Sequence, residues 1–377
     1  MENFSIWNAV MLMGASQGVL LGALLLLKRN SNGASIPLGV SIILMSVDLL
    51  FKFLYDTGLI IQTPYLIYLS EPFNMLFGAL IVVYVRSQMN FRLSLKRSDW
   101  LLLVPFFVYI IYYMPFYVQN SADKLYDLDE FMGNGISSSE NLWEWVFEVV
   151  VNLFFLVVSW RMLRRYHKKI RDVFSDVEKI NYFITQKLII IGVVAYMLEI
   201  LLIVLAFTKV EQVSLYNNYL YAILLVTIYL IGYDGLTAVK QPLPKAMQEE
   251  VHALDEEQVK YRRSSLNGEQ SEAIKHLLVS VMVEHRPYLN PEIRLNDLAE
   301  LVNAPSHHLS QVINEKFEQN FFEFINGYRV EEAKRLLKDS SFKNYSLTAI
   351  GFEVGFNSKS AFYTAFKKLT GTTPAKF

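Results

Sequence analysis

The sequence contains no cysteine among its 377 residues and only six histidines. The absence of cysteine excludes disulfide bonds, thiolate zinc sites and cysteine nucleophiles. The chain also lacks an excess of either charge, because it has 35 basic and 36 acidic residues and a net charge of −1. Overall basicity therefore cannot attract a polyanion to this chain, and any contact with nucleic acid has to be local.

Apolar side chains, in contrast, are abundant. They make up 53% of the residues and give a mean hydropathy of +0.27, which is more apolar than an average soluble protein. The excess lies in residues 1–237, which contain long uncharged runs, whereas residues 238–377 are mixed, polar and patterned for helices. We therefore predict an all-α chain whose two parts lie in different solvents.

The apolar runs are long enough to cross a lipid bilayer, since a membrane-spanning helix needs about 20 predominantly apolar residues. Seven stretches qualify, near 7–27, 36–56, 64–85, 99–118, 142–160, 187–207 and 218–237. The fourth is the least regular, because Pro105 and Pro115 interrupt it. The first is not expected to be a cleavable signal peptide, because no positive residue precedes it and Lys28 and Arg29 follow it. We predict a bundle of seven transmembrane helices.

Lysine and arginine in the short loops predict the orientation of these spans. With the N-terminus outside, the inner loops carry 14 lysines and arginines, whereas the outer loops near 57–63, 119–141 and 208–217 carry only Lys124 and Lys209. The asymmetry predicts a multi-pass protein of the inner, cytoplasmic membrane. The residues after the seventh span are then cytoplasmic.

Ionisable residues inside the predicted spans are candidates for a signal site, because charges in a membrane usually face the bundle interior or a polar cavity. Asp48 and Lys52 lie one helical turn apart and can neutralise each other, whereas Glu71, Glu148 and Glu199 have no partner nearby in the sequence. A polar site for a ligand and simple internal hydrogen bonding both remain open for these residues. The same holds for the first span, where Gly14, Gly18 and Gly22 fit either intramolecular helix packing or dimerisation.

The pattern changes after the seventh span. Pro242 and Pro244 precede a charged run that ends at a turn near Gly268, which predicts an exposed connector. We place the boundaries at 1–237 for the membrane domain, 238–268 for the cytoplasmic linker and 269–377 for a C-terminal domain. The first helix of this domain is expected to bury apolar residues at helical spacing and to stop before Pro287; these residues are Ile274, Leu277, Leu278, Val281 and Met282.

Residues 295–314 have the anatomy of a helix-turn-helix. Ala299 is small enough for two helices to cross closely, Asn303 tolerates a left-handed turn position, and Ser306 can cap the second helix. The exposed face of that helix is expected to carry His307, His308, Ser310 and Gln311. Adjacent histidines diverge on a helix and no third ligand is spaced to help them, so we predict no metal.

A second unit of the same kind follows a long helix predicted from about Phe321 to Leu337. A short helix over 347–354 is followed by a turn at Gly355, a cap at Ser358 and another helix from Lys359 to Leu369. The outer face of this last helix carries Lys359, Ser360, Tyr363, Thr364, Lys367 and Lys368. Residues 343–377 hold five lysines and one glutamate, so the local charge favours contact with phosphate.

Three segments of this region resemble the signature of the AraC/XylS family: GYRVEEAKRLL at 327–337, GFNSKSAF at 355–362 and FKKLTGTTP at 366–374. The resemblance covers about 100 residues in both spacing and composition. The whole chain is also similar, less specifically, to membrane-anchored AraC-type regulators of Bacteroidetes. Asn303 and Gly351 depart from the glycine and alanine that are common at those positions. Members of the family often continue past the position of Phe377 with an arginine and a short tail, so the contact of such a tail is not expected here.

The resemblance implies two helix-turn-helix units joined by a rigid helix, which read two successive major-groove segments on one face of double-stranded DNA. The recognition helices would be Ser306–Lys316 and Lys359–Leu369. The expected DNA-contacting residues are Ser306, His307, His308, Ser310, Gln311, Arg329, Ser358, Lys359, Ser360, Tyr363, Thr364 and Lys367.

We interpret the chain as a membrane-bound one-component transcription regulator, whose spans detect an unknown signal ligand. Its expected partners are DNA, the lipid bilayer and RNA polymerase, with a homodimer as an open alternative. A transporter or channel that carries a regulatory DNA-binding domain is the competing interpretation, although the sequence shows no convincing repeat. We expect neither an enzyme nor a cofactor, because the spans contain no catalytic constellation. The possible signal site comprises Asp48, Lys52, Glu71 and Glu199.

Overall fold

The computed structural model describes residues 5–28, 33, 35–90, 93–134, 139–176, 183–207, 213–237 and 266–377. Within these residues the regular elements are helices, and the extended pairing is an isolated bridge between Phe174 and Arg294. The expected all-α fold is confirmed. The chain divides into two compact units, one of residues 1–163 with 182–240 and the other of residues 164–181 with 241–377. Most of the expected linker, 238–265, lies outside the described residues.

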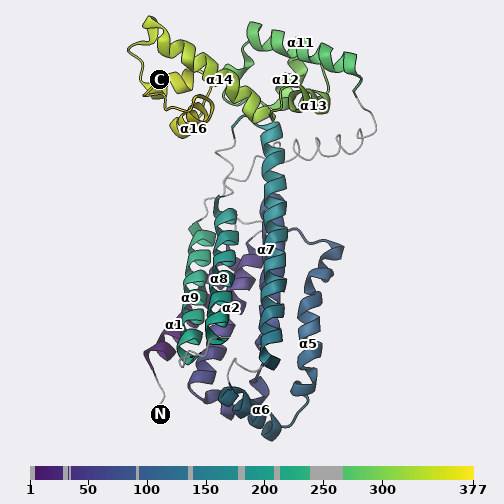
Figure 1. Ribbon diagram of the computed structural model, residues 1–377, viewed down its shortest axis with the longest axis vertical. Helices are drawn as coiled ribbons and strands as arrows, with labels where there is room; N and C mark the ends of the chain where they lie inside the picture. Colours follow the sequence, from purple (N-terminus) through teal and green to yellow (C-terminus); the bar gives the residue numbers. More distant parts are fainter. Residues whose placement is uncertain are drawn as a thin grey trace. The chain divides into compact units, whose positions relative to one another are not determined.

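The first unit is a group of long apolar helices (Figure 1). Helices α1, α2 and α9 contact one another, while α4 packs on α2 and α8 packs on α9. The elements in chain order are α1 (Ile6–Leu27), α2 (Ile36–Asp56), η1 (Leu59–Gln62), η2 (Pro64–Leu66), α3 (Glu71–Asn74), α4 (Leu76–Asn90), η3 (Arg97–Leu103), α5 (Val104–Tyr117), α6 (Ser121–Asn134), α7 (Ser139–Val173), α8 (Phe183–Phe207) and α9 (Val213–Thr237). The last turns of α7, from residue 164, belong to the second unit.

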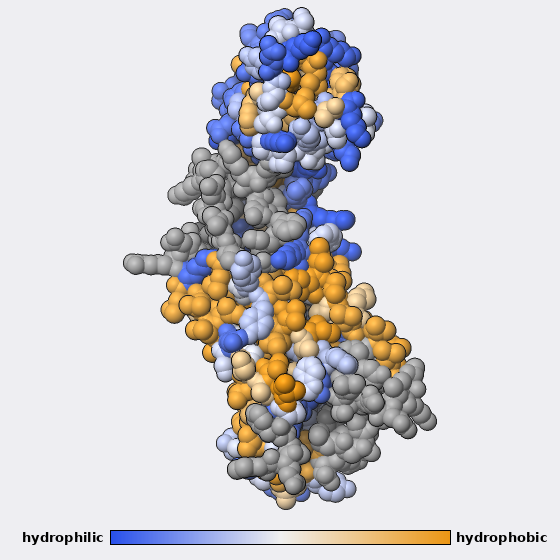
Figure 2. Space-filling view, turned by 90° about the vertical axis from the view of Figure 1, so that its left-hand side faces the viewer, coloured by the Kyte–Doolittle hydropathy of each residue, from blue (hydrophilic) through white to orange (hydrophobic). Residues whose placement is uncertain are grey.

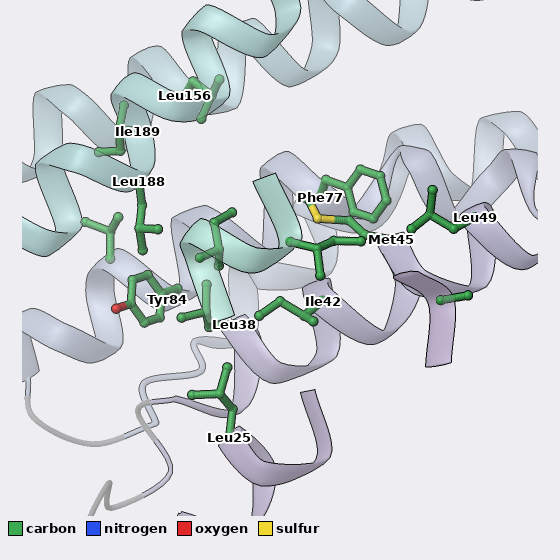
Figure 3. Packing of buried hydrophobic residues seen from close by; sticks show 14 of the residues in the cluster. Leu25, Leu38, Ile42, Met45, Leu49, Phe77, Tyr84, Leu156, Leu188 and Ile189 are labelled. Atoms are coloured by element: carbon green, nitrogen blue, oxygen red, sulfur yellow. The ribbon is translucent and has the colours of Figure 1, made fainter. Parts of the chain in front are cut away.

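The interior of this unit is built from aliphatic and aromatic side chains that several helices contribute. Figure 3 shows Leu38, Ile42 and Leu49 of α2 close to Phe77 and Tyr84 of α4. All five side chains are buried in one cluster, which also includes residues of α1, α7, α8 and α9. The helices therefore share a common core.

Close helix packing in this core depends on the glycines of α1. A methyl group on Gly18 would lie 2.1 Å from the hydroxyl oxygen of Ser46 on α2, and one on Gly14 would lie 2.3 Å from a methyl carbon of Leu225 on α9. Gly22 approaches the carbonyl oxygen of Gly39 in the same way. Of the two alternatives that the sequence left open, the glycine face therefore serves packing within the chain.

Several helices of the first unit are long and apolar enough to cross a membrane. By length and composition, four described helices qualify: Ile6–Leu27, Ile36–Asp56, Arg97–Tyr117 and Trp143–Val173. A fifth span is formed if Pro64–Asn74 and Leu76–Asn90 count together. Apolar side chains on their outer faces are exposed, as at Ile111 with 72%, and Figure 2 shows a broad hydrophobic surface over this unit. The expected number of seven spans stays a prediction.

The third predicted span differs from the expectation of one helix over 64–85. It consists of η2, α3 and α4, with a bend of 41° between Pro64–Asn74 and Leu76–Asn90. Proline lacks the amide proton that a helix interior needs, so it is tolerated mainly at a helix start. Pro64 and Pro72 both occupy such starting positions. The two prolines thus divide the apolar stretch into short elements.

The second unit contains the two predicted helix-turn-helix units. Its elements are α11 (Gly268–Glu284), η5 (Pro287–Leu289), α12 (Leu295–Leu301), α13 (Ser306–Lys316), α14 (Phe321–Lys338), η6 (Ser340–Phe342), α15 (Leu347–Glu353) and α16 (Lys359–Thr370). Helix α14 contacts α13 on one side of the domain and α15 and α16 on the other. The side chains of Asn267, Asn320, Ser346 and Ser358 each accept a hydrogen bond from a backbone amide in the first turn of the following helix, which fixes where these helices begin.

Helix α11 occupies the expected place but buries a narrower face than predicted. Leu278, Val281 and Met282 are buried, whereas Leu277 is 52% exposed. Positions 277 and 278 point about 100° apart on a helix, so only one of the two can lie at the centre of the buried face. The expectation that Leu277 faces the core was therefore wrong.

Candidate nucleic-acid interface

The first helix-turn-helix is formed by α12 and α13, joined by a tight turn. Asn303 adopts a left-handed conformation with φ of 53°, as expected for a turn residue whose short polar side chain tolerates it. The amide of Ala304 donates to the carbonyl oxygen of Ala299 at 3.0 Å. The side chain of Ala299 is buried between the helices. The sequence correctly predicted both the turn and the small residue at the crossing.

Ser306 does not cap α13, contrary to expectation. The cap position belongs to Pro305, and Ser306 is the first residue of the helix. The Ser306 hydroxyl instead donates to Oδ1 of Asn296 on α12 at 2.6 Å. This hydrogen bond ties the two helices of the unit together, so Ser306 supports the position of α13.

The outer face of α13 carries His307, His308 and Gln311, which are partly exposed. The two imidazole rings lie 4.2 Å apart between centroids. Burial and the neighbouring His307 lower the pKa of His308 below its ordinary value, so His308 is neutral at pH 7. Nε2 of Gln311 donates to Glu315 at 2.8 Å, and this contact holds the amide on the surface of the helix.

Ser310 lies on the other side of α13. It is 4% exposed, and its carbonyl oxygen accepts a hydrogen bond from the Asn314 side chain at 2.8 Å. Ser310 therefore cannot reach DNA in this conformation. Asn314 itself is exposed and is a surface residue of the recognition helix that the sequence interpretation missed. Its position one turn after Ser310 and Gln311 was the available signal.

The second helix-turn-helix is formed by α15 and α16, and glycines set its turn. Gly355 has φ of 95°, and a methyl group there would lie 2.4 Å from the carbonyl oxygen of Tyr288. A methyl group on Gly351 would lie 2.8 Å from the ring of Phe362, which is fully buried. The hydroxyl of Ser358 accepts a hydrogen bond from the amide of Ala361 at 3.0 Å, so the expected cap of α16 is confirmed.

The outer face of α16 is open and positively charged. Lys359, Ser360, Thr364 and Lys367 are exposed. The ammonium of Lys359 lies 5.4 Å from the centre of the Tyr363 ring, which is a cation–π arrangement that leaves both groups at the surface. The sequence thus correctly predicted which side of this helix faces solvent.

Lys368 is also exposed on this helix, but Glu323 at the start of α14 engages its ammonium at 2.8 Å. The same lysine holds the pKa of Glu323 below its ordinary value through that hydrogen bond. Lys367, one position earlier, is exposed, and no acidic side chain of the described part of the second unit forms an ion pair with it.

Arg329 of α14 was expected at the DNA surface, but the structure buries it with 1% exposed. Its guanidinium donates to the carbonyl oxygens of Tyr288 and Asn290, both at 2.8 Å, and lies 5.6 Å from the ring centre of Phe356. Burial lowers the pKa of Arg329 to about 10, and nearby Asp176 opposes that shift. Arg329 is an internal residue that joins α14 to both halves of the domain.

The sequence carried a signal for the position of Arg329. Ile325 and Ala333 lie four residues before and after it, and both are buried. Residues at this spacing share one face of a helix. The family resemblance favoured a charged contact with DNA, whereas the periodicity of α14 places the residue on the buried face.

The polar residues of the first unit pair differently from the expectation. The ammonium of Lys52 bonds to Asp56 at 2.5 Å and lies 5.5 Å from the ring centre of Tyr221, so the expected pairing with Asp48 is replaced. A carboxylate that the sequence interpretation missed, Glu144, accepts hydrogen bonds from the hydroxyls of Tyr112 and Tyr113. Asp48, Glu71 and Glu199 are half-buried. No cluster of three metal-ligating side chains occurs among the described residues.

Comparison with known proteins supports the identity of the second unit. Residues 298–377 match a family described as a helix-turn-helix domain. An uncharacterized HTH-type transcriptional regulator of Staphylococcus aureus strain COL is 30% identical over 90 residues, which are 24% of this chain and 12% of that protein. A regulator of strain MSSA476 gives the same identity and coverage. No solved structure gives a significant match. The C-terminal part of the chain is thus a helix-turn-helix domain, and the match concerns that domain alone.

Proposed function

We propose that this protein is a DNA-binding transcription regulator whose two recognition helices, α13 and α16, enter successive major-groove segments. The observation that carries the proposal is the pairing of two helix-turn-helix units by the single helix α14, which contacts α13, α15 and α16. Each recognition helix keeps a polar outer face accessible. Helices of this kind read base edges with the side chains of their first turns.

The side chains divide into two classes on this proposal. His307, His308 and Gln311 of α13 and Lys359, Ser360 and Tyr363 of α16 lie in the first turns and contact bases. Thr364 and Lys367 lie further along α16, where the sugar–phosphate backbone is closer. Phosphate contacts position a protein on DNA, whereas base contacts specify the sequence. Ser306 and Ser358 shape the helix starts, through the bond to Asn296 and the cap on Ala361.

The first unit anchors the regulator in the cytoplasmic membrane and detects its signal. The long apolar helices and their exposed apolar side chains support this part of the proposal. The signal is a ligand of unknown chemistry. Its candidate site comprises the half-buried residues Asp48, Glu71 and Glu199 together with Lys52. RNA polymerase is the expected downstream partner. A homodimer would raise the effective concentration at adjacent DNA sites.

The test compares variants of the full-length protein in detergent, with operator sequences selected from a random duplex library. Gln311→Ala is expected to weaken binding by about 1–3 kcal/mol and to relax the preference at one base pair. Lys367→Gln is expected to weaken binding to all sequences alike and to lower the salt slope by about one. Lys343→Gln removes the same charge from an exposed position outside the recognition helices and is the matched control.

Affinity measured across the selected sequences and several salt concentrations decides between the outcomes. An unchanged sequence preference in alanine variants of all six base-contacting candidates, with the fold intact, would refute the assigned recognition helices. An equal salt slope for the variants at 343 and 367 would remove the phosphate role of α16.

A further inference from the structure

The second unit includes a segment that lies far from it in the sequence. Residues 164–176 belong to this unit, and they comprise the last turns of α7 and the three residues that follow. The apolar stretch of α7 ends near Trp160, and charged residues such as Arg161, Arg164 and Arg165 come directly after it. The segment thus continues the fifth predicted span beyond its apolar part.

The end of α7 is docked as firmly as a core element. Ile170, Val173 and Phe174 are at most 2% exposed, and Ser175 is 3% exposed. The guanidinium of Arg171 lies 4.7 Å from the ring centre of Phe322 at the start of α14. If the end of α7 lay free on the surface, these apolar side chains would be exposed to solvent. Four nearly buried residues in a stretch of six show instead a built contact surface.

The docked segment contacts residues 293 and 294, which lie immediately before the first helix-turn-helix. The backbone of Phe174 pairs with that of Arg294, immediately before α12. The hydroxyl of Ser175 donates to the carbonyl oxygen of Ile293 at 2.8 Å. In both contacts the DNA-binding domain contributes main-chain groups, those of Ile293 and Arg294. They therefore fix the position of the segment against the first helix-turn-helix.

Two side chains of the connecting helix α14 also bind Ser175. Nη2 of Arg329 donates to the Ser175 hydroxyl at 3.3 Å, and Nδ2 of Asn326 donates to the Ser175 carbonyl oxygen at 3.5 Å. Both side chains are buried. Arg329 also binds the backbone of Tyr288 and Asn290, so one guanidinium connects the docked segment, the first half of the domain and the connecting helix.

The second helix-turn-helix is reached through Asn357, in the turn before α16. Its side chain donates to the carboxylate of Asp176 at 2.7 Å and to the carbonyl oxygen of Pro291 at 3.2 Å. The three residues Phe174, Ser175 and Asp176 therefore touch both helix-turn-helix units and the helix between them.

We propose that residues 170–176 are the signal input of the DNA-binding domain, docked in the seam between its two helix-turn-helix units and setting their relative placement. Because α7 is one uninterrupted helix from Ser139 to Val173, a shift or rotation of its apolar part reaches Phe174 unless the helix bends. A displacement at the seam changes the spacing of α13 and α16, and simultaneous reading of two groove segments depends on that spacing. This inference rests on the proposed function, because it assigns the route by which the signal reaches DNA binding.

The test begins with a cross-link between the segment and the second helix-turn-helix, in full-length protein in membrane vesicles. The natural chain has no cysteine, so the pair Asp176→Cys with Asn357→Cys is unique and a short bifunctional thiol reagent should join it. The pair Arg165→Cys with Asn357→Cys is the matched control. Arg165 lies on the exposed face of α7, eight residues before Val173, which is about 12 Å along the helix axis.

The second measurement is the affinity for a duplex selected from a random library. We compare the cross-linked protein, which is the locked form, with the same protein after a cleavable reagent has been reduced, which is the released form. The variant Asp176→Ala is measured beside them, with Arg165→Ala as its control. We expect the locked and released forms to differ about fivefold or more, the usual size of a coupling between sites, and Arg165→Ala to bind like the natural protein.

Absence of the 176–357 cross-link, or equal cross-linking of the control pair, overturns the docking. Efficient cross-linking with equal affinity of the locked and released forms overturns the input role. Failure of the natural protein to select any duplex sequence would instead overturn the proposed function and with it the input role, while the cross-link would still decide whether the segment is docked.

Discussion

At the scale of a single residue, the proposed function leads us to expect that His308 of α13 couples DNA binding to pH. Its pKa lies below the ordinary value because of burial and of the neighbouring His307. The free domain therefore keeps the ring neutral near pH 7. The negative electrostatic potential of bound DNA favours the protonated form and should raise that pKa again, so we expect the complex to take up a proton that the free protein does not hold.

We expect operator affinity to rise as the pH falls from about 7.5 to 6, and His308→Gln to flatten this dependence. Without DNA the sign is opposite: the unfolded chain takes up the proton first, so the domain loses stability as the pH falls below the ordinary pKa of histidine. Titration of affinity with pH checks the prediction. His285→Gln is the control, since His285 is exposed at the end of α11; an equal loss of pH dependence in this variant would contradict the assignment to α13.

At the scale of elements, the packing of α15 against α16 depends on a glycine where the family resemblance makes alanine common. The side chain of Phe362 fills the space beside Gly351, and a methyl group added to this glycine would lie only 2.8 Å from the ring. Gly351→Ala should destabilise the second helix-turn-helix by about 1–3 kcal/mol, the usual penalty of overpacking a core.

Gly327 is the matched control for this substitution. It lies in the interior of α14, and a methyl group there meets no atom within 4 Å. Gly327→Ala should stabilise the domain by about 0.5–1 kcal/mol, because alanine loses less backbone entropy in a helix. Pulse proteolysis of the full-length protein in urea measures both effects. Equal stability of the two variants would mean that Phe362 moves aside without penalty.

The elements that the sequence predicted well are those held by local rules. The turn before α13 and the start of α16 followed from such rules, as the left-handed Asn303 and the cap at Ser358 illustrate. Arg329 was misplaced because a resemblance was preferred to the periodicity of its helix. The docking of Ser175 had no local signal at all, since its partner Ile293 lies 118 residues away. Long-range contacts of this kind arise from tertiary packing, which a pattern within one helix does not contain.

At the scale of the whole molecule, contacts within the first unit join helix ends that the charge asymmetry assigns to the same side of the membrane. The ammonium of Lys28, after α1, donates to the carbonyl oxygens of Gly235 and Leu236 near the end of α9, both at 2.9 Å. Both places are predicted to be cytoplasmic. The Tyr117 hydroxyl at the end of α5 donates to the carbonyl oxygen of Tyr68 at 3.0 Å, at the side predicted to be outside. These pairings agree with an odd number of crossings between the N-terminus and residue 237.

Reporter fusions in intact cells test this topology directly. Fusions after residues 58, 130 and 212 should report the outside, and fusions after 92, 172 and 245 should report the cytoplasm, because positively charged loops stay on the cytoplasmic side. The pair at 130 and 172 is the most informative, since α7 alone separates the two positions among the predicted spans. Neutralising Arg161, Arg164 and Arg165 together should weaken the cytoplasmic signal at 172, whereas neutralising Lys124 should leave the outer signal at 130 unchanged. A cytoplasmic signal at 130 in the natural sequence would contradict the orientation, and the same compartment for 130 and 172 would show that α7 does not cross the membrane.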